Sequence, residues 1–155
     1  MAAQISVLLI EDEEHIRRII KYNLEMENFT VQPAQDGIEG IKMAHEDPKP
    51  KVILLDWMMP GMSGIEVLSA IRADEEIRKI PVIMLTAKGT IGDIEDAFEA
   101  KADGYITKPF DPELLGEMIK DKLRTCMHNR RKYRKEEKKQ ARDRSRKKNV
   151  ANLVK

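Results

Sequence analysis

Short aliphatic runs alternate with amphipathic stretches along the first 125 residues of the chain. Residues 5–10, 52–55 and 82–85 are near-continuous runs of Val, Ile, Leu and Met. Runs of this length and composition, each followed by a helical pattern, predict strands that are buried on both faces. Residues 29–31 and 105–107 are weaker candidates for two further strands.

Between the runs, apolar residues recur at the spacing of an α-helix. The groups are Ile16, Ile19, Ile20 and Leu24; Ile38, Ile41 and Ala44; Ile65, Leu68 and Ile71; Ile94, Ala97 and Phe98; and Leu115, Met118, Ile119 and Leu123. Asp36, Ser63 and Thr90 each precede a carboxylate by three residues, and Asp111 precedes Pro112, which are helix-start signals. The element order is therefore (βα)5. Crossovers between parallel strands are right-handed. This element order therefore predicts an α/β fold with helices on both faces of a parallel sheet.

Acidic, hydroxyl and ammonium groups stand where the predicted strands end. Glu11 and Asp12 follow the first strand, Asp56 the third, Thr86 the fourth and Lys108 the fifth. Parallel α/β sheets bind ligands beyond the carboxyl ends of their strands, so these side chains are expected to share one site. A small set of carboxylates suits Mg²⁺, which prefers oxygen ligands and often binds carboxylate and phosphate oxygens together.

The same residues indicate phosphoryl chemistry without a nucleotide-binding loop. Neither a P-loop nor a G-x-G-x-x-G motif follows the first strand, and the acidic residues 11–14 would repel phosphate directly. A phosphoryl group is expected to enter only with a metal ion and Lys108. Asp56 is then the natural nucleophile, with Thr86 as a hydrogen-bond donor to the phosphoryl oxygens.

These motifs resemble the receiver domain of two-component response regulators, the CheY-like family. The matching segments are Glu11-Asp12, the run from Asp56 to Gly64, Thr86-Ala87, and the run from Tyr105 to Phe110. The resemblance covers about residues 5–124, with every motif in order. It implies a doubly wound, flavodoxin-like sheet with strand order 2-1-3-4-5.

The resemblance also implies roles for individual residues. Asp56 would accept a phosphoryl group from a sensor histidine kinase or a phosphotransfer protein. The chain would not be an enzyme beyond its own self-phosphorylation and autodephosphorylation. Asp12, Asp56 and the Met58 carbonyl would bind Mg²⁺, with Glu11 acting through water. Thr86 and Tyr105 would form the switch pair, and the Lys108–Pro109 bond would be cis. The face made by the fourth helix, fifth strand and fifth helix would then control a downstream partner.

Three positions depart from the family pattern or adjust its chemistry. Lys101 stands where the family usually has glycine, so a left-handed backbone there would cost about 1 kcal/mol. Met58 and Lys88 occupy positions that modulate dephosphorylation. Because Met58 cannot hydrogen-bond an attacking water, the resemblance predicts a long-lived phosphoryl group.

Two other functions compete with this interpretation. A phosphatase of the haloacid dehalogenase type also forms an aspartyl phosphate, but it needs a second Asp where this chain has Met58. A pseudo-receiver would bind partners without phosphate, and the intact set of Asp56, Thr86 and Lys108 argues against it.

The last thirty residues differ chemically from the rest. Of 28 Lys and Arg residues, 13 lie in 126–155, together with only 3 of the 27 Asp and Glu residues. The tail therefore has a net charge of +10 and residues 1–125 a net charge of −9. This contrast predicts a receiver domain over 1–125 and a basic tail over 126–155, which is either a helical extension or disordered.

The tail leaves several functions open. It could bind nucleic acid, an anionic membrane or another anionic partner, dock on the acidic receiver until phosphorylation, or have no specific role. No helix-turn-helix or catalytic module is recognised in the 155 residues, so we expect a stand-alone regulator, either a monomer or a phosphorylation-dependent homodimer. No long apolar segment spans a bilayer and Cys126 is the single cysteine, so a cytoplasmic location is expected. His15, His45 and His128 are expected to lie on surface helices.

Overall fold

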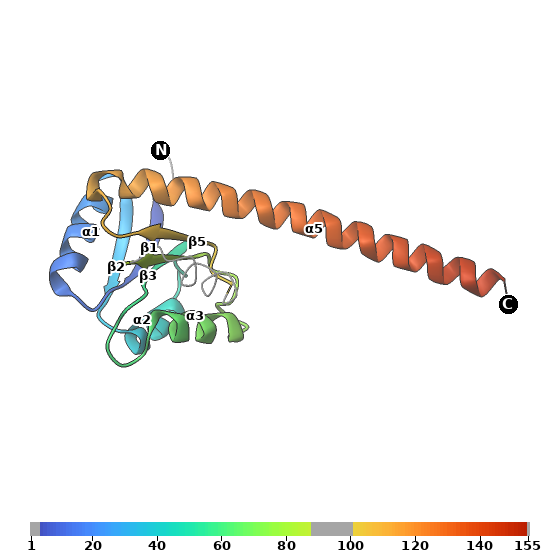
Figure 1. Ribbon diagram of the computed structural model, residues 1–155, viewed down its shortest axis with the longest axis horizontal. Helices are drawn as coiled ribbons and strands as arrows, with labels where there is room; N and C mark the ends of the chain where they lie inside the picture. The colour runs from blue at the N-terminus through green and yellow to red at the C-terminus, as the bar shows by residue number, and fades with distance from the viewer. Residues whose placement is uncertain (1–3, 88–100, 155) are drawn as a thin grey trace. The chain divides into compact units, whose positions relative to one another are not determined.

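A computed structural model describes residues 4–87 and 101–154, and its centre is a five-stranded parallel sheet. The strands are β1 (Ile5–Ile10), β2 (Phe29–Ala34), β3 (Val52–Asp56), β4 (Val82–Thr86) and β5 (Gly104–Thr107). Their spatial order is β2-β1-β3-β4-β5, and every neighbouring pair is parallel (Figure 1). The predicted fold class and strand order are therefore confirmed.

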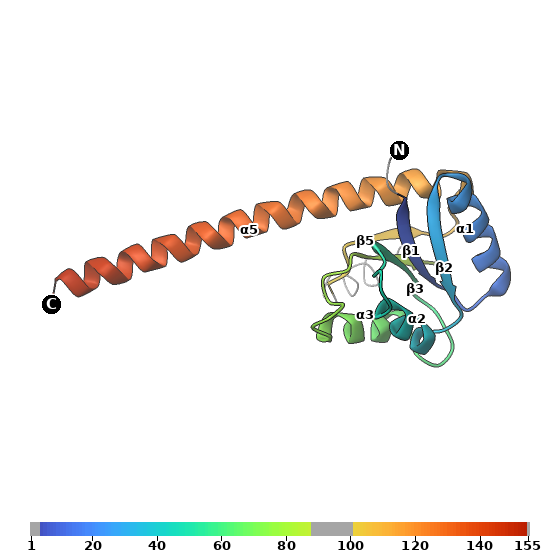
Figure 2. The same ribbon diagram turned by 180° about the vertical axis from the view of Figure 1, so that it is seen from behind.

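Helices cover both faces of the sheet, as Figures 1 and 2 show from opposite sides. The described helices are α1 (Glu14–Met26), α2 (Gly37–Ala44), α3 (Gly64–Ala73) and α5 (Leu115–Leu153), preceded by the short 3-10 turn η1 (Pro112–Leu114). The helix expected around Ile94 and its cap at Thr90 lie outside the described residues, as does Lys88. α1 and the start of α5 lie on one face, with α2 and α3 on the other.

Alternate residues of each strand enter two separate apolar cores. On β1, Leu8 and Ile10 pack with α2 and α3, whereas Val7 and Leu9 pack with α1 and the start of α5. All five residues of β3 and all five of β4 are buried. Burial on both faces explains why the first four residues of each strand are all apolar rather than alternately apolar and polar.

Local backbone signals agree with the predicted helix starts. The Asp36 side chain accepts a hydrogen bond from the Glu39 amide, and Ser63 accepts one from the Glu66 amide. The Asp111 side chain accepts a hydrogen bond from the Glu113 amide and caps the turn η1, which leads directly into α5 at Leu115. Lys101 has a φ of +67°, so the left-handed backbone considered for this position is present.

β2 is longer than the sequence pattern predicted. It runs to Ala34 and includes Pro33, which pairs with Leu9 of β1. Proline lacks the backbone N–H that a central strand needs. Because β2 is an edge strand, Pro33 can be accommodated there. The polar residues of β2 are exposed.

The chain divides into two units, residues 1–123 and 124–155. The first contains the sheet and its covering helices, and the second contains the remaining turns of α5. Residues 131–154 of the second unit are exposed. Within the described part of the chain, no helix is both long and apolar enough to cross a membrane.

Candidate functional site

The polar residues predicted at the strand ends lie together at one edge of the sheet. Glu11 follows β1, Asp56 and Thr86 are the last residues of β3 and β4, and Lys108 follows β5. Glu11, Asp56 and Thr86 are buried, which is unusual for residues of these types. The fold therefore brings together side chains that are separated by up to 97 residues in the chain.

Lys108 joins the two buried carboxylates. Its Nζ lies 3.1 Å from Asp56 Oδ1 and 3.4 Å from Glu11 Oε2. Burial disfavours the charged ammonium, but Asp56 and Glu11 together outweigh that effect and raise the pKa of Lys108. Its backbone amide donates to the Thr86 carbonyl, which links β4 to the loop after β5. The Lys108–Pro109 bond is cis.

The negative charge at this site exceeds what Lys108 can balance. Carboxylate oxygens of Glu11, Asp12 and Asp56 lie within 4.8 Å of one another. Burial, and then repulsion from Asp56, raises the pKa of Glu11 to about 7. Burial is also the main cause that raises the pKa of Asp56, with Asp12 adding repulsion and Lys108 opposing the shift. A cluster that resists ionisation in this way fits a divalent cation, which would stabilise all three carboxylates.

Arg17 supports the acidic loop from α1, a role that the sequence analysis missed. Its Nη1 donates to the backbone carbonyls of Glu11 and Asp12, at 2.8 and 2.9 Å. These bonds fix the loop that presents the two carboxylates. An arginine one turn into a helix after an acidic loop is a weak sequence signal, because the same residue on a solvent-exposed face would look identical.

Gly64 allows the turn after Asp56 to close tightly. Its amide donates to the Trp57 carbonyl at 3.0 Å, and a Cβ at this position would lie 2.3 Å from the Asp56 carbonyl oxygen. Within the turn, Met58 has an exposed side chain while Met59 is buried. Met58 is two residues beyond Asp56, at the position where the resemblance places a carbonyl ligand for the metal.

The two residues expected to act as a switch lie on neighbouring strands. Thr86 is 2% exposed, at the end of β4. Tyr105 on β5 pairs in register with Met84, is partly buried against the core shared with α2 and α3, and has the Lys122 ammonium 5.4 Å from its ring centroid. Thr86 and Tyr105 therefore lie on adjacent strands.

An apolar groove of about 420 Å³ adjoins Lys108. Three isoleucines of α1 form one side, and the loop after β5 forms the other. The lining residues are Ile16, Ile19, Ile20, Ala87, Lys108, Pro109, Phe110 and Pro112. The groove thus offers an apolar surface directly beside the acidic site.

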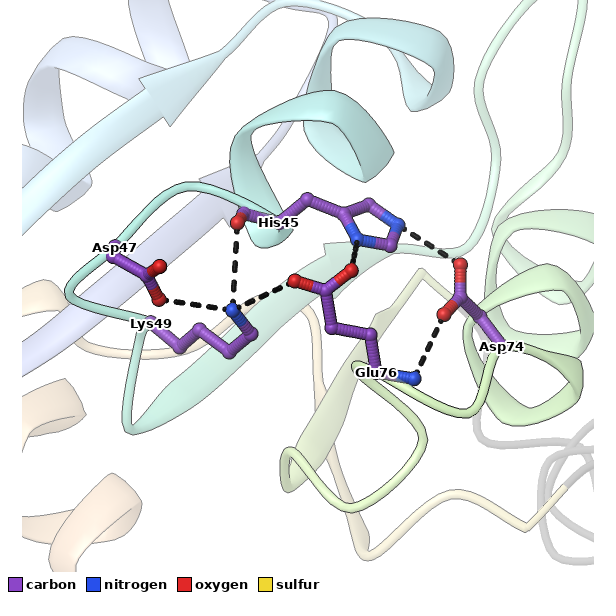
Figure 3. Close-up of polar contacts among 5 residues, drawn as sticks. All are labelled: His45, Asp47, Lys49, Asp74 and Glu76. Atoms are coloured by element: carbon purple, nitrogen blue, oxygen red, sulfur yellow. Dashed lines mark hydrogen bonds and ion pairs between the residues drawn. The ribbon is translucent and has the colours of Figure 1, made fainter.

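A second polar cluster lies at the other end of the sheet, where strands begin (Figure 3). His45, at the end of α2, has Nε2 2.9 Å from Asp74 and Nδ1 2.9 Å from Glu76. Lys49 binds Glu76 and Asp47, at 3.0 and 2.9 Å. The sequence analysis expected His45 to lie on a surface helix. It could not foresee partners that come from the turn after α3, about thirty positions away.

An α/β sheet with this strand order, and with this set of acid, hydroxyl and ammonium groups at its carboxyl edge, is the arrangement expected of a receiver domain. The family model described as the response regulator receiver domain matches residues 7–120, so the chain belongs to that family. It is 42% identical over 118 residues to the phosphate regulon transcriptional regulatory protein PhoB of Escherichia coli, a match that covers 76% of this chain and 51% of PhoB. It is also 42% identical to the DNA-binding dual master transcriptional regulator RpaA of Synechocystis, covering 76% and 48%.

Solved structures of similar shape are themselves receivers. The chemotaxis protein CheY4 of Vibrio cholerae superposes with a TM-score of 0.72 at 29% identity, covering 77% of this chain and 98% of CheY4. A CheY-like receiver domain protein of Methanospirillum hungatei gives 0.70 at 28% identity, covering 81% and 98%. The chain spans about half the length of the curated relatives it matches.

Proposed function

We propose that this chain is a phosphorylation-dependent switch in which Asp56 accepts a phosphoryl group. The observation that carries the proposal is the position of the Lys108 ammonium, 3.1 Å from Asp56 and 3.4 Å from Glu11 at the ends of three parallel strands. An ammonium held between two buried carboxylates neutralises charge where a phosphoryl group would arrive.

The phosphoryl donor is a phosphohistidine of a sensor histidine kinase or phosphotransfer protein. An oxygen of Asp56 bonds to phosphorus while the bond between phosphorus and the donor imidazole nitrogen breaks. That nitrogen keeps the electron pair and takes a proton from water. Lys108 pairs with the phosphoryl oxygens, and the Thr86 hydroxyl donates to one of them. The apolar groove beside Lys108 gives the donor protein a surface to bind.

Glu11, Asp12, Asp56 and the Met58 carbonyl are the residues that would hold Mg²⁺, Glu11 through water. When bound, the ion would supply positive charge that stabilises the phosphoryl oxygens. The carboxylates of this chain orient it, and Arg17 holds the loop that carries two of them. Covalent chemistry is limited to self-phosphorylation of Asp56 and its hydrolysis. Met58 stands where a phosphatase of the haloacid dehalogenase type has a second Asp.

Phosphorylation is proposed to act through the surface next to the site. Thr86 moves toward the phosphoryl group and Tyr105 turns inward behind it. Together they change the surface around β5 and the start of α5, which is the described part of the face that the family resemblance implies. That face controls a downstream protein or a phosphorylation-dependent homodimer, in the cytoplasm.

The proposal is tested by incubating the full chain with Mg²⁺ and acetyl phosphate and measuring its intact mass. We expect the mass of one added phosphoryl group, which is lost in Asp56→Asn and when EDTA replaces Mg²⁺. Asp47→Asn, which changes the ion pair with Lys49 at the opposite end of the sheet, is the matched control and keeps the modification. If acetyl phosphate and beryllofluoride both leave the protein unchanged, the chain is a pseudo-receiver.

A further inference from the structure

Along residues 131–146, one side of the helix α5 consists only of lysine and arginine. At 3.6 residues per turn, seven basic residues fall within an arc of about 120°. Every residue of 131–146 that falls in this arc is one of the seven, which we call the basic face. The basic face is Arg131, Lys132, Lys135, Lys138, Lys139, Arg142 and Arg146.

The acidic residues of the same segment avoid the basic face. Glu136, Glu137 and Asp143 all lie outside the arc. All seven basic side chains are exposed, and none of them takes part in an ion pair within the part of the chain that the structure describes. Random placement of charges would mix the signs, so this separation marks a surface suited to a polyanion.

The distribution of apolar residues argues against a membrane as that polyanion. A helix that lies in a membrane interface needs an apolar face opposite its basic one. Beyond Met127 the large apolar residues are Tyr133 and, at the end of the chain, Val150, Leu153 and Val154, so no apolar face lies opposite the basic face along residues 131–146. Tyr133, the single aromatic residue of the segment, lies outside the basic face, so stacking on unpaired bases is also disfavoured.

We propose that the basic face binds the phosphodiester backbone of double-stranded nucleic acid without reading its sequence. The face is about 22 Å long at 1.5 Å per residue. A duplex carries one negative charge per roughly 1.7 Å, which is more than enough phosphates for seven side chains. The proposal goes beyond phosphorylation of Asp56 and does not rest on it, so Asp56→Asn should bind as the unsubstituted chain does.

The test measures fluorescence anisotropy of a labelled mixed-sequence duplex DNA of about three helical turns as the full chain is added. A second arm uses duplex RNA, because both share the phosphodiester chemistry. One variant neutralises three residues of the basic face, Lys135→Gln, Lys139→Gln and Arg142→Gln. The matched control neutralises two lysines and one arginine outside it, Arg144→Gln, Lys147→Gln and Lys148→Gln. Circular dichroism checks that both variants keep their helix.

We expect binding in the micromolar range at about 50 mM salt, and a slope of log K against log salt of about −6. The basic-face variant should bind at least about tenfold more weakly, with the slope reduced by about 3, while the control changes affinity less than about threefold. Three results would overturn the proposal: equal weakening of both variants, no binding to either duplex at low salt, or binding to phosphatidylserine vesicles but not to a duplex.

Discussion

The residues in and around the site have roles that are set by their contacts. Lys108 balances Asp56 and Glu11, Arg17 fixes the loop that carries Glu11, and Gly64 lets the turn close behind Asp56. Met58 differs from them because this residue is 72% exposed. It can be exchanged without disturbing the core, which makes it the clearest position at which to test phosphoryl lifetime.

Phosphorylated Asp56 should persist for minutes or longer, because the Met58 thioether cannot orient a water for attack. Met58→Asn places an amide there and should shorten the half-life several-fold. The measurement is loss of the phosphoryl group by mass spectrometry after acetyl phosphate is removed. Met59→Leu, a volume-conserving change at the buried neighbour, serves as the control. A half-life of seconds in the unsubstituted chain would refute the prediction.

Lys101 stores backbone strain that glycine would relieve. A left-handed backbone destabilises a lysine by about 1–2 kcal/mol. Glycine also has more conformational freedom in the unfolded chain, which offsets about half of the stability gained by relieving the strain. Lys101→Gly should therefore raise the free energy of unfolding by up to about 1 kcal/mol in urea titrations. Asn28, also at a φ of +67°, is the matched control, since Asn tolerates this conformation and its Oδ1 accepts from Gln4. Asn28→Gly should give no gain.

At the scale of elements, the sequence pattern was most informative where burial was complete. β1, β3 and β4 were recognisable because aliphatic runs are required inside a sheet covered on both faces. The far end of β2 was not, because an edge strand tolerates polar residues and Pro33. The strand-end site could be predicted since parallel strands share one carboxyl edge. The contacts of Arg17 and His45 could not, because nothing local distinguishes them from surface residues.

His45 connects α2 to the turn after α3 through ion pairs with Asp74 and Glu76. With both ring nitrogens next to carboxylates, it must be doubly protonated to donate to Glu76 and Asp74, and hydrogen bonding to Glu76 raises its pKa above 6.5. The stabilisation is therefore complete below the unfolded-state pKa, and it is lost as the pH rises through the higher folded-state pKa. Lys49, and then His45, lower the pKa of Glu76, so that carboxylate loses its contribution only in acid.

A double-mutant cycle of His45→Gln and Glu76→Gln tests this link by urea unfolding. The coupling free energy should be larger at about pH 6 than at about pH 8.5. A cycle of Glu76→Gln with Lys49→Met is the control, since the ammonium of Lys49 stays charged over that range. A His45–Glu76 coupling that does not change with pH would show that the imidazole is not the protonated link described.

At the scale of the whole molecule, the buried acids lower stability unless a cation joins them. Mg²⁺ should therefore raise the unfolding temperature of the full chain, by an amount that grows with the logarithm of its concentration above the dissociation constant. Asp12→Asn should reduce this rise severely, whereas Asp47→Asn, at the opposite end of the sheet, should leave it unchanged. The measurement is thermal unfolding followed by the fluorescence of Trp57, the single tryptophan. An equal rise in both variants would indicate a nonspecific salt effect.

Gly64 restricts how the loop after Asp56 can diversify. A methyl group there would collide with the backbone of Asp56 and Trp57, so the constraint comes from the main chain and would persist whatever side chains surround it. Met58 and Pro60 project into solvent and carry no comparable restriction. A library that randomises this loop to change phosphoryl lifetime or donor preference should therefore recover many residues at those two positions and only glycine at position 64.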